Sequence, residues 1–379
     1  MKKEITQKIE KIMESKTGTD AFFSFENFLL GCSKIYSVGI KVRSLLYKFS
    51  VIRSKKLPCF VISIGNITVG GTGKTPMTMY VAKIIKDLGY KPVVITRGYQ
   101  GKYKGAQSIV SDGSNFFLSV HDAGDEAFMM AEVLKIPVIV GKKRFQAGKL
   151  AIKEFNPDVI ILDDAFQHIA LKRDLDLLLC DFNKPLGNFQ LLPRGRLREP
   201  HTALERSDAV IFTRSDKTEE LDQKKPVQTK KLEIFKNKQV FNTCHSAFVA
   251  DALNCPPSFD LTNLNIKVFL FSGIANNGDF RSTCEKMGME INGVAEFPDH
   301  HWYAKGDLIS IYEKFKESRA DYLITTQKDY IKIKEPVSDF FPSICLLVIG
   351  VKIKFKPEDK DKFANLIKSE FSTYLKTKE

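Results

Sequence analysis

Long apolar runs are missing from this sequence. No stretch approaches the ~20 consecutive apolar residues that a membrane-spanning helix needs, and residues 1–16 are charged throughout, without the apolar core of a signal peptide. A content of 43% hydrophobic and 27% charged residues excludes a disordered or collagen-like chain. We therefore expect a cytosolic, globular protein with two or three domains in its 379 residues.

Paired cysteines are missing as well. The seven cysteines are odd in number, scattered, and include no CxxC pair, so no pattern indicates a zinc site. Cys180 ends the apolar run 177–180. Because cytosolic proteins keep their thiols reduced, we predict reduced, buried thiols rather than disulfides.

Acidic residues are in deficit. There are 45 Asp and Glu against 58 Lys and Arg, a net charge of +13, which suggests a polyanionic partner such as nucleic acid, an acidic membrane or a phosphorylated substrate. No basic motif interleaved with aromatic residues is visible, so we predict that the partner is not nucleic acid.

The segment between Lys34 and Lys56 has seven basic residues and no acidic one. It also carries an apolar stripe at spacings of three and four, one face of a helix: Ile35, Val38, Val42, Leu45, Phe49 and Ile52. Such a segment can lie on an anionic membrane, or it can pack its stripe on its own domain and leave a solvated basic edge. The segment alone leaves both open.

After residue 58, short apolar strands alternate with helical segments, which is typical of a parallel sheet covered on both faces. We predict strands at 60–67, 92–96, 137–140, 159–162, 175–180, 209–212, 268–271, 322–325 and 345–349, and helices at 74–88, 125–134, 144–155, 279–287, 307–316 and 361–376. The predicted fold is α/β: a P-loop NTPase-like parallel-sheet domain, a second, smaller α/β domain and an N-terminal amphipathic helix. The predicted boundaries are 1–57 (helical segment), 58–225 (P-loop domain), 226–265 (hinge) and 266–379 (C-terminal domain).

A glycine-rich loop follows the strand 60–67 and opens a helix. Its residues are Gly70, Gly71, Thr72, Gly73, Lys74 and Thr75. Backbone N–H groups and the helix N-terminus there would face a phosphate, Lys74 would reach the β- and γ-phosphates, and the Thr75 hydroxyl would hold Mg²⁺. Thr68 stands where the strict P-loop pattern has its first glycine. We predict that this loop binds a nucleotide with Mg²⁺.

Further candidates are ambiguous on their own. Asp163 and Asp164 follow the strand 159–162 and suit a metal beside the phosphates, or a turn or helix cap. Asp125 begins a predicted helix and can be a simple cap. His300 lies in a turn, and its neighbourhood alone does not separate a site from a surface position.

An arginine-rich loop, 193–200, holds Arg194, Arg196 and Arg198 before Glu199. Arginine forks match phosphate oxygens, although a solvated basic loop has the same composition. His168, four residues after Asp164, can line the same site or simply pack.

Together these motifs resemble the tetraacyldisaccharide 4'-kinases of lipid A biosynthesis. The matching residues are 65–68 and 70–76, Arg97-Gly98-Tyr99, Gly124-Asp125-Glu126, Asp163-Asp164-Ala165-Phe166-Gln167-His168, Leu192-Pro193, Leu197-Arg198-Glu199, Ser272-Gly273-Ile274, Pro298-Asp299-His300 and Lys328-Asp329. The membrane- or DNA-organising ATPases share GGxGK[ST] but carry a lysine before the paired glycines, where this sequence has Val69.

The resemblance implies that the γ-phosphate of ATP passes to the 4'-hydroxyl of a tetraacyldisaccharide 1-phosphate, a lipid A precursor. It implies Asp125 as the base, supported by His300, with Lys74 on the phosphates. The expected metal ligands are Thr75, Asp163, Asp164 and Glu199, and the expected substrate-binding residues are Arg97, Gln167, His168 and Arg198. A base and a histidine from separate domains would couple the chemistry to domain closure.

The resemblance also implies a place in the cell. We expect a monomer, peripheral on the cytoplasmic face of the inner membrane, with its N-terminal helix on the anionic surface. Two positions depart from the family. Ala165 replaces a common glycine and would be strained if its φ were positive, and Arg194 replaces a small residue and can add a phosphate contact or nothing.

Overall fold

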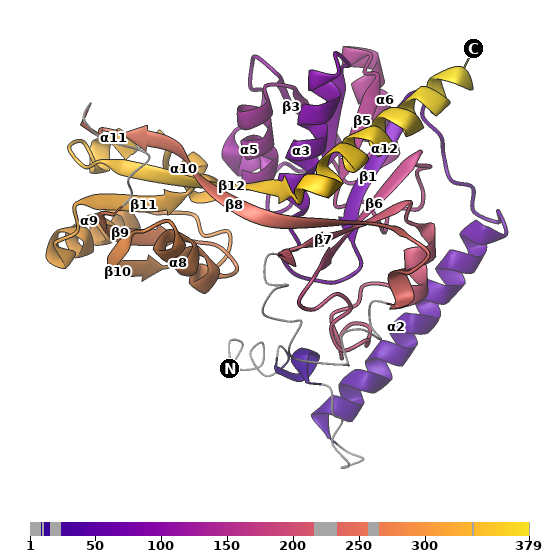
Figure 1. Ribbon diagram of the computed structural model, residues 1–379, viewed down its shortest axis with the longest axis horizontal. Helices are drawn as coiled ribbons and strands as arrows, with labels where there is room; N and C mark the ends of the chain where they lie inside the picture. The colour runs from indigo at the N-terminus through magenta and orange to yellow at the C-terminus, as the bar shows by residue number, and fades with distance from the viewer. Residues whose placement is uncertain are drawn as a thin grey trace. The chain divides into compact units, whose positions relative to one another are not determined.

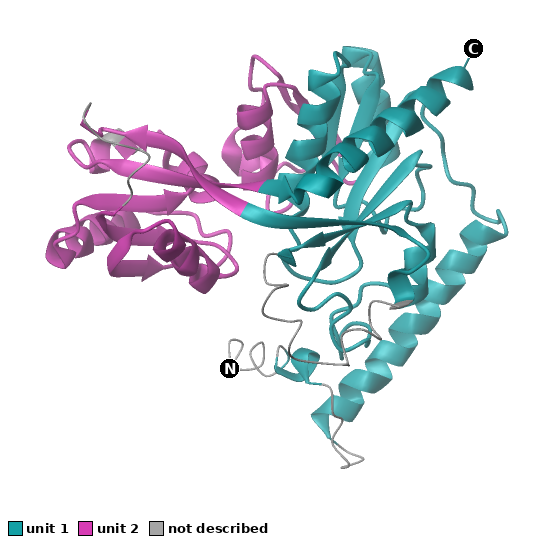
Figure 2. Cartoon of the chain, viewed as in Figure 1, with its two compact units in different colours: residues 1–97, 143–245, 353–379 teal, residues 98–142, 246–352 magenta. Residues whose placement is uncertain are grey.

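The computed structural model describes residues 9, 11–15, 24–215, 233–256, 265–335 and 337–378. The chain forms two compact units (Figure 2). Unit 1 comprises Met1–Arg97, Lys143–His245 and Ile353–Glu379, and unit 2 comprises Gly98–Lys142 and Ser246–Lys352. Both units are α/β, and most strand pairs are parallel, which confirms the predicted fold class.

The compact units interleave along the chain, unlike the expected domains. The segment 98–142 joins unit 2, and the closing segment 353–379 returns to unit 1. The reason is that β8 (Gln239–Leu253) runs through much of the expected hinge 226–265 as a 15-residue strand. The chain thus enters unit 2 inside β8 and leaves it inside β12 (Leu346–Phe355). Residues 226–232 and 257–264 of the expected hinge lie outside the described part.

The sheet of unit 1 has the strand order β7-β6-β1-β5-β2, with all these neighbours parallel. The strands are β1 (Phe60–Asn66), β2 (Pro92–Thr96), β5 (Val159–Asp163), β6 (Leu175–Asp181) and β7 (Ala209–Thr213). Nearly every residue in them is buried. Continuous apolar runs therefore predicted them, as expected for a sheet covered on both faces.

Helices α3 (Lys74–Asp87), α6 (Arg144–Phe155) and α12 (Pro357–Lys376) belong to the same unit (Figure 1). Helix α12 packs aromatic rings on the sheet, with Phe371 5.3 Å from Phe60 between ring centroids. Two 3₁₀ turns, η1 (His201–Arg206) and η3 (Glu233–Phe235), flank β7 in the chain. The core of unit 1 thus fixes the strand ends from which its loops emerge.

Unit 2 contains a sheet with the order β10-β9-β11-β12 and an antiparallel pair, β3 with β4. The strands are β3 (Gln107–Asp112), β4 (Pro137–Gly141), β9 (Lys267–Ser272), β10 (Glu290–Glu296) and β11 (Tyr322–Thr326). The helices are α4 (Val120–Ala123), α5 (Asp125–Leu134), α8 (Asn277–Lys286), α9 (Lys305–Ser318), α10 (Gln327–Ile333) and α11 (Val337–Phe340). Helix α10 packs against α5, and this contact builds the site described below.

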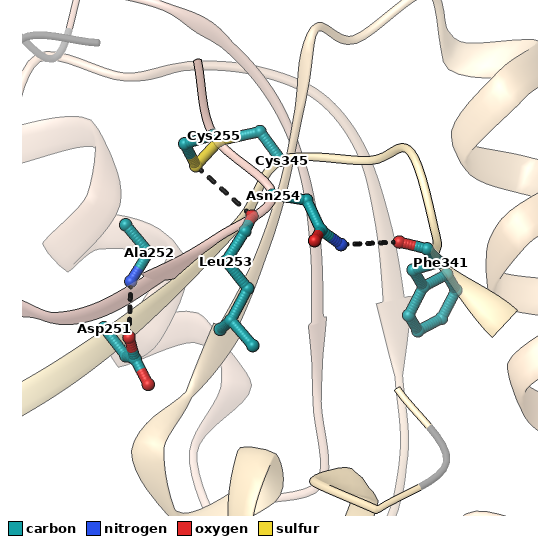
Figure 3. The surroundings of a disulfide bond; sticks show 7 residues. All are labelled: Asp251, Ala252, Leu253, Asn254, Cys255, Phe341 and Cys345. Atoms are coloured by element: carbon teal, nitrogen blue, oxygen red, sulfur yellow. Dashed lines mark hydrogen bonds between the residues drawn. A yellow bond between two sulfur atoms is a disulfide. The ribbon is translucent and has the colours of Figure 1, made fainter. Parts of the chain in front are cut away.

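A disulfide joins Cys255, after β8, to Cys345, before β12 (Figure 3). Beside it, the Asn254 side-chain amide donates to the carbonyl of Phe341 at 3.0 Å. The prediction that all thiols are reduced was therefore wrong for this pair. The two cysteines are 90 residues apart in sequence, so only the fold brings them together. The thiols of Cys59, Cys180 and Cys284 are free and buried, as predicted.

Helix α2 (Phe25–Lys48) is held to unit 1 by polar contacts. Ser24 caps its start by accepting from the N–H of Asn27. The Ser33 hydroxyl donates to the carbonyl of Leu191 at 2.8 Å, and the Arg43 guanidinium donates to the carbonyl of Gln167 at 2.7 Å. The apolar stripe is on the other side: Ile35 is 76% exposed and Phe49, just past the helix, 71%. The stripe is therefore exposed, and the alternative in which it packs on its own domain does not hold.

Within the described residues, no helix is both long and apolar enough to cross a membrane. The exposed stripe of α2 is thus an apolar surface on a helix that lies outside the core.

Candidate active site

The glycine-rich loop leaves the end of β1 and leads directly into α3. Gly70 and Gly73 have φ of 119° and 77°, conformations that favour glycine. The first turn of α3 has no acidic residue, so the positive end of the helix dipole is uncompensated by its own side chains. Just before the paired glycines, the N–H of Val69 donates to the carbonyl of Arg196 at 2.8 Å, which ties the loop to the arginine-rich segment. This is the geometry of a phosphate-binding loop.

Lys74 and Arg198 face one carboxylate. The Lys74 ammonium is 3.8 Å from Oδ1 of Asp164, and Nη1 of Arg198 donates to the same oxygen at 2.9 Å. Asp164 has a φ of 46°, which turns the chain immediately after β5. Two cations therefore face one half-exposed carboxylate at the carboxyl end of β5, in unit 1.

Asp163 is the last residue of β5 and is 2% exposed. Its carboxylate accepts from the hydroxyls of Thr78 at 2.9 Å and Thr96 at 3.3 Å. Nη2 of Arg144 donates to its backbone carbonyl. Burial lowers the pKa of Arg144 to about 10, although the nearby charge of Asp163 acts in the opposite direction.

The remaining expected metal ligand has a partner of its own. Glu199 is 2% exposed, and Nη2 of Arg206 donates to its Oε2 at 2.5 Å. Within the described ranges, no three His, Cys, Asp or Glu side chains form a metal-binding group. Asp163, Asp164 and the hydroxyl of Thr75, in the first turn of α3, are an oxygen-only set of the kind that suits Mg²⁺, which usually keeps several waters and substrate oxygens.

The expected substrate-binding residues of unit 1 differ in how tightly they are held. Nε2 of Gln167 donates to the carbonyl of Asn66 at 2.7 Å, and Arg198 reaches Oε1 of Gln167 at 3.4 Å. Arg97 directly follows β2 and is exposed. Arg97 is thus accessible, while Gln167 is already engaged.

His168 lies among arginines. Burial lowers its pKa to about 4, and the neighbouring charges of Arg144 and Arg173 act in the same direction. A neutral imidazole can accept or donate one hydrogen bond at each nitrogen.

We expect His168 to remain neutral down to about pH 4. The unfolded chain protonates this ring near pH ~6.5, so the stability that the neutral ring contributes is fully present above pH ~6.5. It is lost as the pH falls through the folded value. Imidazole carbon shifts recorded by NMR from pH 3.5 to 8, assigned with His168→Gln, measure this directly. A midpoint near the unfolded value would contradict it.

The two departures from the family have structural explanations. Ala165 is fully buried and its φ is not positive; the adjacent Asp164 takes the positive φ instead. Arg194 is 5% exposed, and its Nη1 donates to the carbonyl of Ile12 at 2.6 Å. Of the two alternatives for Arg194, the structure does not favour a phosphate contact, because the guanidinium ties the loop to the segment 11–15. Arg196 pairs with Glu14 at 2.9 Å.

In unit 2, the structure brings Asp125 and His300 together. Asp125 opens α5 and is 2% exposed, and its Oδ2 lies 2.8 Å from Nδ1 of His300. Its Oδ1 accepts from the N–H of Glu126 at 2.9 Å. Burial by itself raises the pKa of Asp125, but the hydrogen bond and charge of His300 and the charges of Lys328 and Lys332 together outweigh burial and hold this pKa below its usual value. The site thus contains an ionised, oriented carboxylate.

His300 has a φ of 59°, and its N–H donates to the carbonyl of Gly273 at 3.0 Å. The ring of Tyr99 is 5.3 Å away between centroids. Asp125 and His300 both belong to unit 2, because the segment 98–142 joins it. The expectation that they come from separate domains was wrong.

Relatives of this chain have one common name. The sequence profile of the family described as tetraacyldisaccharide-1-P 4'-kinase matches residues 25–372. A protein named tetraacyldisaccharide 4'-kinase from Syntrophus aciditrophicus is 40% identical over 329 residues, which cover 85% of this chain and 88% of that protein. The chain belongs to the tetraacyldisaccharide 4'-kinase family.

Other members of the kinase family also match this chain over most of its length. The tetraacyldisaccharide 4'-kinase of Desulfatibacillum aliphaticivorans is 36% identical over 376 residues, covering 96% of this chain and 98% of that one. The crystal structure of LpxK from Aquifex aeolicus in complex with ATP matches with a TM-score of 0.72 and 32% identity, covering 92% of this chain and all of that one.

The kinase-family motifs did not point to every residue of the unit 2 site. The side chain of Lys332 is fully buried, and its Nζ is 3.6 Å from Oδ2 of Asp125. Its signal in the sequence is a lysine four residues after Lys328, on the same face of a helix. That helix, α10, is seven residues long and was not predicted.

Proposed function

We propose that this protein transfers the γ-phosphate of ATP to the 4'-hydroxyl of a tetraacyldisaccharide 1-phosphate, a late step of lipid A biosynthesis. The observation that carries this proposal is the family match across residues 25–372. Such a transfer needs a group that binds phosphate and a base. Unit 1 has a phosphate loop, and unit 2 has a buried carboxylate that is hydrogen-bonded to a histidine.

Unit 1 has the role of holding the nucleotide. The N–H groups of the loop 70–75 and the N-terminus of α3 bind phosphate oxygens, and Lys74 exchanges its contact with Asp164 for the β- and γ-phosphates. Thr75, Asp163 and Asp164 would hold Mg²⁺, which supplies charge neutralisation on the phosphates. Glu199 is held by Arg206, so we assign the metal role to the first three. We assign substrate binding to Arg97, Arg198 and His168, because Gln167 already donates to the carbonyl of Asn66.

Unit 2 has the role of taking the proton. As the 4'-oxygen forms its bond to the γ-phosphorus and the bond to ADP breaks, the hydroxyl proton passes to the carboxylate of Asp125. The Nδ1–H of His300 donates to Oδ2 of Asp125 and orients it. Phosphoryl transfer depends mostly on positioning and on neutralising charge, so a fixed, ionised base suits it.

The acceptor dependence of ATP consumption tests this function. Purified protein is incubated with ATP and Mg²⁺, with and without the tetraacyldisaccharide 1-phosphate in mixed micelles, and ADP is measured. We expect ADP formation only when the acceptor is present. ADP formed at the same rate without acceptor would indicate an ATPase and contradict the proposal.

The protein acts, we propose, as a monomer on the cytoplasmic face of the inner membrane, with α2 on the anionic surface. The exposed stripe of α2 lies beside the exposed ammonium groups of Lys34, Lys41 and Lys48. Apolar side chains can then enter the acyl boundary while the lysines reach anionic headgroups. The insoluble acyl chains of the proposed substrate require access to that surface.

We expect the triple substitution Ile35→Ser, Val38→Ser and Val42→Ser to weaken vesicle binding by about 10²-fold. These side chains are 50–76% exposed, so their loss should disturb folding little, and each would contribute about 1 kcal/mol on partial burial in lipid. Co-sedimentation with vesicles of one-third phosphatidylglycerol measures this. Ile309→Ser, at an exposed position of α9, is the matched control. Equal binding by the triple variant and the control would contradict the membrane role of α2.

A further inference from the structure

We propose that α10 positions the base of the reaction: Lys332, anchored by Asp329, together with Lys328, holds Asp125 ionised and His300 in the tautomer that donates to it. This inference rests on the proposed function of Asp125 and His300. Both lysines belong to unit 2 and the phosphate loop to unit 1, so their roles can be tested separately from nucleotide binding.

The side chain of Lys332 has no exposure to solvent. Its Nζ lies 2.9 Å from Oδ1 of Asp329 and 3.6 Å from Oδ2 of Asp125. A buried charge is costly unless it is paired and hydrogen-bonded. Lys332 is paired with two carboxylates that are themselves buried. Its charge is therefore directed at Asp125 without screening by water.

Asp329 links this cation to the histidine. Its Oδ2 accepts from the N–H of Gly273 at 3.0 Å and from the hydroxyl of Thr326 at 2.7 Å. The carbonyl of that same Gly273 accepts from the N–H of His300. A Cβ at position 273 would lie 3.0 Å from Cβ of His301 and 3.2 Å from Oδ1 of Asp329. One carboxylate thus anchors both the lysine that faces Asp125 and the backbone that carries His300.

Lys328 lies one helical turn before Lys332, on the same face of α10. Its Nζ is 3.3 Å from Nε2 of His300 and 3.8 Å from Oδ2 of Asp125. An ammonium group can only donate, so Nε2 must accept and the ring proton must be on Nδ1, facing Asp125. Oδ2 of Asp299 is also 3.7 Å from Nε2, but the ammonium of Lys328 is nearer, so these contacts favour a proton on Nδ1. Among these groups, the substrate proton goes to Asp125.

The charged groups around Asp125 come from three elements. Helix α5 supplies Glu126, the turn 298–301 supplies Asp299 and His300, and α10 supplies the two lysines with Asp329. Asp299 and Glu126 pair with Lys328 at 3.2 and 3.7 Å. Burial lowers the pKa of this lysine, but the charges of Asp125, Glu126 and Asp299 together outweigh burial and hold this pKa above its usual value. Removing either lysine leaves Asp125 facing fewer cations and an unchanged number of carboxylates. The pKa of Asp125 must then rise.

The test is the pH dependence of kcat for Lys332→Met and Lys328→Met, with ATP and the tetraacyldisaccharide 1-phosphate. An opposite charge at this distance lowers a carboxyl pKa by about 1–3 units, so we expect the acid limb of each variant to move up by about that much. KM for ATP should stay unchanged, since unit 1 is untouched. Lys334→Met, at an exposed position just after α10, is the control and should keep the wild-type profile.

Lys332→Met leaves Asp329 with one partner fewer and can fail to fold, so Lys328→Met, at a partly exposed position, keeps the proposal falsifiable. Nitrogen-15 shifts of the His300 ring in the unmutated protein give a readout without activity: we expect the proton on Nδ1. A proton on Nε2, or unshifted acid limbs in folded variants of an active enzyme, would overturn this inference alone. Absence of transfer by the unmutated protein would instead overturn the proposed function.

Discussion

We expect Asp125→Asn to lower kcat for transfer by about 10²–10⁴-fold, the range over which a general base contributes. The substitution keeps the shape of a side chain that is 2% exposed. Its single amide oxygen can replace only one of the two carboxylate oxygens, Oδ2 facing His300 and Oδ1 facing the N–H of Glu126. The substitution removes the negative charge and the basicity that accept the hydroxyl proton. Radiolabelled phosphate on the lipid, separated by thin-layer chromatography, measures the rate.

The Asp125→Asn variant should bind ATP as tightly as the unmutated protein, because the phosphate loop belongs to unit 1. Asp339→Asn, an exposed carboxylate in the same unit, is the matched control and should keep full activity. Turnover by Asp125→Asn within a few-fold of this control would show that the proton goes elsewhere.

The second large effect is expected at Lys74. The Lys74 ammonium is 3.8 Å from Oδ1 of Asp164, and we propose that it turns to the β- and γ-phosphates when ATP binds. Lys74→Met removes this cation. Loss of one preorganised charge at a site of developing charge costs about 10²–10³-fold in kcat. We also expect weaker binding of ATP, which isothermal titration calorimetry measures in the presence of Mg²⁺.

Lys83→Met is the control for this change, since Lys83 is an exposed lysine on the same helix. It should leave both ATP affinity and kcat unchanged. Wild-type ATP affinity and turnover in Lys74→Met would exclude the loop 70–75 as the phosphate site.

Local patterns predicted the elements that hold the nucleotide side of the site. The strands of unit 1 are continuous apolar runs because both faces are covered, and the glycines of the loop take positive φ where the chain must turn into α3. These features depend on neighbours in sequence, so the sequence alone was sufficient for them.

Other parts depend on contacts between distant residues. The strand β8 mixes apolar and polar residues and is mostly half-buried, so it does not stand out as a strand, and the expected hinge was placed across it. Helix α10 is too short for a clear period. The approach of Lys332 to Asp125, more than 200 residues apart, is set by the packing of α10 on α5.

The role of Arg194 was left open, and the state of Cys255 was wrongly predicted, for the same reason. A guanidinium in a basic loop resembles a phosphate contact until the carbonyl of Ile12 is placed against it. A cysteine without a nearby partner in sequence resembles a free thiol until Cys345 is brought to it. Sequence supplies the residue types in these cases, and tertiary packing decides their partners.

We propose above that this protein phosphorylates the 4'-hydroxyl of the lipid A disaccharide. The decisive experiment is incubation of the purified protein with ATP, Mg²⁺ and the tetraacyldisaccharide 1-phosphate, followed by tandem mass spectrometry. We expect a product one phosphate heavier, with the added group on the 4' position, and far less of this product in the Asp125→Asn reaction. An unchanged lipid, or a phosphate added elsewhere on it, would show that the protein does not carry out this transfer.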